Sequence, residues 1–178
     1  MLGLFRRDDK GALAAKRLYD AIVAQARSPV FHRSLKVPDT IDGRFDLLVL
    51  HLYLALDRLK AAGGKGSDLA QALTTMTFAG FDGALRDLGV SDVGLARKLK
   101  AMANAYYGRL EAYSEAGDSE EHLAAAVLRN IYRGDEARGR EAARLARYVA
   151  AVRKRFRAED VTAELLEGSL DFGPPPEE

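Results

Sequence analysis

The fold is decided by residues 42–62, which read DGRFDLLVLHLYLALDRLKAA. A helix drawn through this stretch carries apolar side chains on nearly every side, and a helix that is apolar all round is buried at the centre of a domain. A buried strand is the alternative for such a run, but its length and the absence of turn signals favour a helix. We therefore expect a buried central helix that other helices surround.

Segments on both sides of this helix repeat apolar residues at intervals of three and four, which is typical of amphipathic helices. Gly63-Gly64 ends the central helix, Ser119 caps a later one, and Pro38-Asp39-Thr40 supplies a cap for the central helix itself. The sequence predicts an all-α, single-domain bundle of six to seven helices. The expected parts are a flexible N-terminus (1–9), a helical domain (10–168) that contains an irregular connector (28–41), and an extended proline-containing tail (169–178).

Composition limits the possible functions. The chain has 178 residues, 48% of them apolar and 30% charged, which fits one globular domain. With 27 basic and 26 acidic residues the net charge is +1, so there is no overall attraction to nucleic acid or membrane. Cysteine is absent, which excludes disulfides and thiolate metal sites. No secretory signal and no apolar run of a membrane span is found, so we expect a cytoplasmic protein whose Leu2, Leu4 and Phe5 touch a membrane surface at most peripherally.

Three polar residues interrupt the central helix at intervals of seven. Arg44, His51 and Arg58 therefore stack on one side of it. Removing such groups from water is costly unless they find partners, for which Asp39, Asp42 and Asp82 are the plausible candidates. The seam is either a recognition or relay site or a buried network that fixes helix register. We favour the network, because one histidine between two cations is a poor general base.

Other features are less specific. Asp82 and Arg86 are spaced as a surface ion pair of one helix. In the run from Tyr106 to Arg109, followed by Tyr113, the mid-helix Gly108 implies a close helix crossing or a bound apolar segment, with simple packing as the alternative. The last long helix is strongly basic, and its arginines either dock an anionic surface such as RNA or lipid headgroups or form a solvated face.

No motif of a common enzyme class is present. The chain lacks a P-loop, a dinucleotide fingerprint and a zinc spacing, so we expect no cofactor and no metal. One alternative is an all-α isoprenoid or lipid-handling enzyme, but its paired aspartates are missing because Arg86 stands four residues after Asp82. Another is a nucleic-acid-binding helical module built on the basic last helix, which lacks a helix-turn-helix pattern, and we expect no specific DNA binding.

Residues 15–133 resemble the ubiquinol–cytochrome c chaperone family, helical assembly factors of the cytochrome bc complex (respiratory complex III). The resemblance is strongest over residues 37–51, VPDTIDGRFDLLVLH, in which the P-D-T-x-D-G-R-F run is specific. Shorter matches are LYDAIVAQAR at 18–27, FAGFD at 78–82, LRDLGV at 85–90, YGRL at 107–110 and AVLRN at 126–130.

The resemblance implies a binding protein, not an enzyme. Members of this family hold newly made cytochrome b and associate with the ribosome near its tunnel exit, and a peripheral contact with the inner face of the membrane would be consistent with that role. An apolar groove would shield the client's helices by helix-in-groove packing. The residues expected to line or brace that groove are Arg44, His51, Asp82, Arg86, Tyr107, Arg109 and Tyr113.

Overall fold

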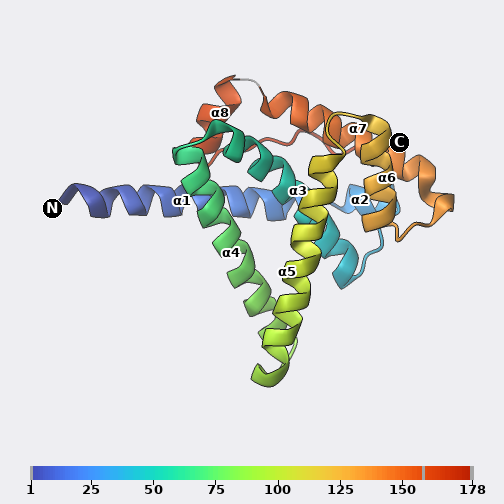
Figure 1. Cartoon of the computed structure of the whole chain (residues 1–178), viewed down its shortest axis with the longest axis horizontal. Helices are drawn as coiled ribbons and strands as arrows, with labels where there is room; N and C mark the ends of the chain where they lie inside the picture. The colour runs from blue at the N-terminus through green and yellow to red at the C-terminus, as the bar shows by residue number, and fades with distance from the viewer. Residues whose placement is uncertain (1, 158, 177–178) are drawn as a thin grey trace.

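A computed structural model describes residues 2–157 and 159–176 of the chain (Figure 1). Within these residues the chain forms eight α-helices and one 3₁₀ turn, and no strand. The all-α, single-domain bundle expected from the sequence is therefore confirmed. Its elements are α1 (Leu2–Ala26), α2 (Pro29–Arg33), α3 (Ile41–Ala62), α4 (Lys65–Asp87), α5 (Asp92–Glu115), α6 (Glu120–Ile131), η1 (Glu136–Arg138), α7 (Gly139–Phe156) and α8 (Glu159–Leu166).

Helix α3 is the central element, as expected. It packs against α1, α4, α5, α6, α7 and α8, and nearly all its side chains from Leu47 to Leu56 are buried. At its start the Thr40 hydroxyl accepts a hydrogen bond from the backbone N–H of Gly43, and at its end Gly63 takes a positive φ of 63°. A side-chain cap and a terminal glycine thus fix both ends of the helix.

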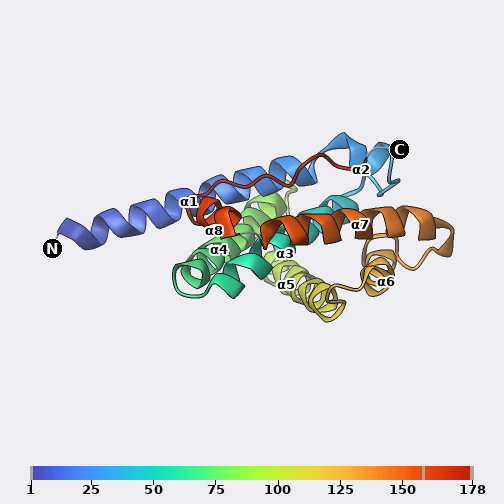
Figure 2. The same cartoon turned by 90° about the horizontal axis from the view of Figure 1, so that it is seen from above.

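The other helices surround α3 in two groups. Helices α4 and α5 extend away from the body of the molecule and converge at their far ends, where they are joined (Figure 1), while α6 and α7 pack against each other on another side of α3. The C-terminal segment after α8 returns toward the end of α1 (Figure 2), where Gln25 Nε2 donates to the carbonyl of Gly173 over 3.1 Å. This segment, part of the expected tail, buries the side chain of Phe172.

Several boundaries differ from the sequence expectations. Residues 28–41 were expected to be irregular, but α2 forms inside them because Pro29 occupies a first helical position, where its missing N–H costs nothing. Helix α4 begins at Lys65, directly after the glycine pair that ends α3. Residues 2–9, expected as a flexible terminus, are the first turns of α1.

Some expectations concern parts that the structure leaves out. Met1 and the last two residues of the expected tail, 177–178, lie outside the described residues. The side chains of Leu2, Leu4 and Phe5, to which a membrane contact was assigned, are also outside the described part. Among residues 2–157 and 159–176, none of the helices combines the length and the hydropathy that a membrane span requires.

Candidate functional site

An open cleft of about 500 Å³ lies where four helices meet: the start of α3, the end of α4, the middle of α5 and the end of α6. Its apolar lining consists of Ile41, Phe45, Leu85, Ala101, Met102 and Ala105. Its polar lining consists of Asp42, Lys98, Arg109, Arg129, Asn130 and Arg133. Ile41 is 67% exposed, although it is a large apolar residue. An exposed apolar residue at the edge of a partly apolar cleft makes this cleft the candidate binding site.

One face of α5 forms the longest wall of the cleft. The residues that α5 contributes are spaced by three and four, at 98, 101, 102, 105 and 109, and therefore share one side of the helix. The opposite wall is α3, where Phe45 packs against Phe81 of α4 with ring centroids 5.4 Å apart. Three of the four helices that form the cleft, α3, α4 and α5, thus pack against one another.

Two arginines of the cleft lining contact a buried carboxylate on α3. The Asp46 side chain is fully buried on α3, and its Oδ1 accepts from Arg109 Nε over 2.7 Å. Its Oδ2 lies 2.8 Å from Nη2 of Arg133, which follows α6. Burial raises the pKa of Asp46, and the two guanidinium groups oppose that rise. The two arginines therefore offset part of the cost of burying this carboxyl group.

Arg109 has a double role in the cleft. Besides Asp46 it donates to the carbonyl of Ala105 over 3.0 Å, and its guanidinium lies 5.1 Å from the ring centroid of Phe45. A guanidinium over an aromatic face is a favourable contact. Arg109 therefore connects α5 to α3 and at the same time lines the cleft.

The cleft carries a net positive charge. Among the described residues around it, Lys98, Arg109, Arg129 and Arg133 are cationic, while Asp42 and the buried Asp46 are anionic, so the sum is 4 − 2 = +2. Arg133 is 49% exposed even though it contacts Asp46. The arrangement offers an apolar floor beside exposed cations, and it suits an apolar segment that has an acidic group close to it.

His51 lies away from the cleft, in the core. Its Nδ1 donates to the carbonyl of Leu47 over 2.7 Å, and its Nε2 accepts from the hydroxyl of Tyr148 over 3.0 Å. That hydroxyl accepts from Gln25 Nε2 over 2.9 Å. Both ring nitrogens of His51 and the Tyr148 hydroxyl have a hydrogen-bond partner, and burial lowers the pKa of His51 to about 4. A neutral imidazole thus links α1, α3 and α7.

The expected polar seam of α3 is not one network. Arg44 is 63% exposed and its Nε donates to Asp39 Oδ1 over 2.7 Å, which is one of the partners named from the sequence. His51 uses a tyrosine and a backbone carbonyl, and Arg58 donates to the hydroxyl of Thr162 on α8. Expecting aspartate partners throughout was wrong, because the bundle turns the three positions toward different neighbours: solvent, α7 and α8.

The remaining candidate residues lie in three other places. Arg86 is exposed and pairs with Asp82 at 2.8 Å and with Asp92 at 2.9 Å, so it joins the end of α4 to the start of α5. Tyr107 is 55% exposed on α5 and stacks against Phe78, with ring centroids 6.1 Å apart. Tyr113 is fully buried in the core.

Gly108 does not mark a helix crossing. Among the described residues, no atom comes within 4 Å of the position that a Cβ on Gly108 would take. The expectation of a close crossing inside this chain is therefore wrong, since this side of α5 faces outward. The other interpretation, that Gly108 leaves room for a bound apolar segment, stays a prediction.

Sequence reasoning placed only Arg109 in the cleft and missed its partner Asp46. The signal for Asp46 was present, because a single carboxylate inside an otherwise apolar helix must find a cationic partner when that helix is buried. Arg133 gave no such signal, since it lies in a loop among other arginines. In the part of the chain that the structure describes, no three histidine or acidic side chains come together as a metal site would require.

Comparisons with known proteins match this chain to one family. The sequence model described as ubiquinol-cytochrome C chaperone matches residues 33–172. Two curated proteins named ubiquinol-cytochrome c reductase complex assembly factor 1, from Mus musculus and Homo sapiens, are each 27% identical over 121 residues. The match covers 67% of this chain but only 41% of the mouse protein and 40% of the human protein.

A solved structure is similar over almost the whole chain. It is a crystal structure of the Cbp3 homolog from Brucella abortus, 36% identical in sequence, with a TM-score of 0.82. The similarity covers 96% of this chain and 97% of that one. Both the helical fold and its sequence pattern are therefore shared with that protein.

Proposed function

Because this chain belongs to the ubiquinol-cytochrome C chaperone family, we propose that it supports assembly of the cytochrome bc complex by holding newly made cytochrome b. The observation that carries the proposal is the open cleft between α3, α4, α5 and α6, with its apolar floor and cationic rim. The curated relatives are named as assembly factors of the same enzyme complex. This chain matches less than half of their length, so the client and its place of binding are proposals for this protein.

The size of the cleft indicates how a client binds. A volume of about 500 Å³ accommodates a few side chains and not a whole membrane-spanning helix. We therefore infer that one face of a client helix docks through anchors spaced by three or four residues, as in other helix-in-groove complexes. Ile41, already exposed at the edge, gains apolar contact when the client binds.

The charges of the rim select among apolar segments. Lys98, Arg129 and Arg133 surround the floor with cations, and only Asp42 opposes them on the cleft lining. An acidic residue or a carboxylate next to the client's apolar anchors is attracted there, while a basic flank is repelled. The proposed client segment is thus an apolar helix with an acidic flank.

The residues expected from the resemblance have different proposed roles. Arg109 lines the cleft, and Tyr107, exposed on α5, extends the contact surface beyond it. Arg86 braces the corner between α4 and α5 through Asp82 and Asp92, which keeps Leu85 in the wall. His51 and Tyr113 act through the scaffold because they are buried, and Arg44 lies in a separate pocket.

Two substitutions with the same chemistry test the cleft. Ile41→Asp places a carboxylate at the edge of the cleft, and Val93→Asp places one on a residue that is 93% exposed outside it. Both positions are in the first turn of a helix, where aspartate is favourable, so both variants fold. We expect I41D to recover roughly tenfold less cytochrome b than wild type in a pull-down, since an isoleucine contact is lost. V93D recovers the wild-type amount.

The possible results distinguish an error in the proposed client from an error in the proposed binding site. If wild-type protein recovers no cytochrome b, the proposed function is wrong. If I41D and V93D recover the same amount as wild type, cytochrome b is bound elsewhere and only the cleft assignment fails. Circular dichroism of both variants checks that the helical content is unchanged.

Contacts with the ribosome and with a membrane surface are a further part of the proposal. They are supported by the exposed basic residues of α7, which include Arg140, Arg147, Lys154 and Arg155. A cationic helix face attracts RNA and anionic headgroups alike, and such binding weakens steeply with salt. Co-sedimentation with ribosomes at low and high salt measures this contribution.

A further inference from the structure

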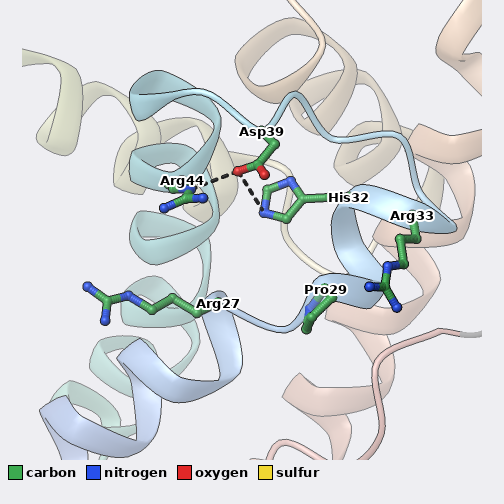
Figure 3. Close-up of a pocket in the computed structure, with 6 residues that line it drawn as sticks. All are labelled: Arg27, Pro29, His32, Arg33, Asp39 and Arg44. Atoms are coloured by element: carbon green, nitrogen blue, oxygen red, sulfur yellow. Dashed lines mark hydrogen bonds and ion pairs between the residues drawn. The ribbon is translucent and has the colours of Figure 1, made fainter.

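A second pocket, of about 430 Å³, lies on another part of the surface and is strongly basic (Figure 3). It is lined by Arg27, which directly follows α1, by Pro29, His32 and Arg33 of α2, by Asp39 of the connector and by Arg44 of α3. It shares no lining residue with the cleft. A volume of this size lies within the range of small-ligand sites, which is about 300–1,000 Å³.

The charge of this pocket is only partly balanced. Three arginines and one aspartate line the pocket among its described residues, so the formal sum is 3 − 1 = +2 with His32 counted as uncharged. In the part of the chain that the structure describes, the side chains of Arg27 and Arg33 have no ion pair. Cations held around one cavity repel each other, and an anion bound there removes that repulsion.

The fixed hydrogen bonds leave donors free for such an anion. Arg44 donates through Nε to Asp39 Oδ1 over 2.7 Å, which engages one of the five N–H groups of its guanidinium. Figure 3 shows Arg44 and Arg27 on one side of the pocket, Arg33 on the other, and His32 between them. His32 is held by a bond of 2.9 Å between its Nδ1 and the carbonyl of Val37. The cations thus surround the cavity from three elements of the fold.

The geometry points to a binding site for a phosphate group in this pocket. A phosphate monoester carries a charge near −2 at neutral pH and has three acceptor oxygens, which suits several guanidinium groups better than a single carboxylate does. The phosphate comes from a soluble metabolite or from a lipid headgroup, and both present the same chemistry. This inference stands on the pocket alone and does not depend on cytochrome b as the client.

The test uses a pair of charge-matched variants. Arg27→Gln/Arg33→Gln removes the two arginines that make no ion pair with described residues, so folding is preserved. Arg97→Gln/Lys100→Gln removes the same charge from exposed positions of α5 that line neither pocket. Two probes are titrated: inorganic phosphate by calorimetry, and phosphatidylcholine vesicles with and without phosphatidic acid by co-sedimentation. We expect R27Q/R33Q to bind at least about tenfold more weakly, and R97Q/K100Q to bind both probes like wild type.

A third variant is expected to bind phosphate more tightly. Asp39→Asn removes the carboxylate of the pocket and releases Arg44, so phosphate binding becomes tighter than in wild type. Saturable binding of inorganic phosphate that R27Q/R33Q loses supports the site with a soluble ligand. Binding of phosphatidic acid vesicles alone, lost in the same variant, supports it with a lipid headgroup. Equal loss in both double variants, or no saturable binding of either probe, overturns it.

Discussion

Two polar clusters lie five residues apart on α3, and they differ in almost every respect. The cluster around His51 is neutral and buried, and both His51 ring nitrogens and the Tyr148 hydroxyl have a partner. The cluster around Asp46 is charged, borders an open cleft and includes the half-exposed Arg133. A neutral network holds helices together without a large desolvation cost, whereas a charged one is best kept near water and cationic partners. The comparison supports a structural role for the first cluster and is consistent with the proposed client binding beside the second.

The largest expected effect comes from breaking the charged cluster. Arg109→Met leaves the fully buried Asp46 with Arg133 as its only partner among the described residues. We expect a loss of about 3 kcal/mol in the free energy of unfolding, because a buried carboxylate loses most of its compensation. Urea denaturation followed by circular dichroism measures it. The double variant Asp46→Leu/Arg109→Met should recover part of the lost stability. An unaltered stability of R109M would contradict the interpretation that Arg109 stabilises a buried charge on Asp46.

The cluster around His51 should make the stability of the protein depend on pH. The folded-state pKa of His51 is about 4, below its ordinary value of 6.5, so the unfolded chain binds more protons between these pH values. The contribution of His51 to stability is therefore complete above pH 6.5 and is lost as the pH falls toward 4. The shift corresponds to about 3 kcal/mol. His51→Gln, which keeps a donor and an acceptor, should remove this part of the slope; parallel curves for both proteins would refute the assignment.

Two buried tyrosines differ in whether their hydroxyl has a hydrogen-bond partner among the described residues. Tyr148→Phe deletes the hydroxyl that bonds both His51 and Gln25, and we expect a loss of about 1–3 kcal/mol because buried polar atoms lose their partner. The buried hydroxyl of Tyr113 has no hydrogen-bond partner among the described residues, so Tyr113→Phe should leave stability unchanged or raise it slightly. Equal losses in the two variants would show that these hydroxyls do not differ in this way.

The smallest effect is expected at the surface. Arg86 contacts two aspartates, but all three side chains are exposed and water screens their charges. Arg86→Ala should unfold at the same urea concentration as wild type within experimental error. A loss as large as that of R109M would mean that the corner between α4 and α5 contributes to stability as much as the buried ion pair does.

Much of the fold could be predicted from local sequence. The all-round apolar pattern of α3 identified the central helix, and Thr40, Ser119 and Gly63 identified helix ends, because each of these signals acts within a few residues of the chain. The short α2 and the 3₁₀ turn before α7 were missed, since each involves only one turn of helix and gives almost no periodicity.

The site was predicted less completely, and position along a helix explains why. Arg44 and His51 repeat at seven residues and look equivalent in sequence, yet one is exposed and the other buried. Arg109 was selected from the family resemblance, but nothing near it in the chain identifies Asp46, 63 residues away, as its partner. The spacing of residues along a helix indicates which of them share a face. It does not indicate which residues of other helices pack against that face.

By itself the sequence determined that this protein is a helical bundle with an apolar helix at its centre, because hydrophobic periodicity and helix caps act over a few residues. Only the tertiary structure decided which polar groups of that helix are buried in the core and which lie beside a cleft. Tyr148 reaches His51 across 97 residues, and the cleft needs four helices to form its walls. Such contacts depend on how helices pack in space, and the order of residues along any one of them does not specify that.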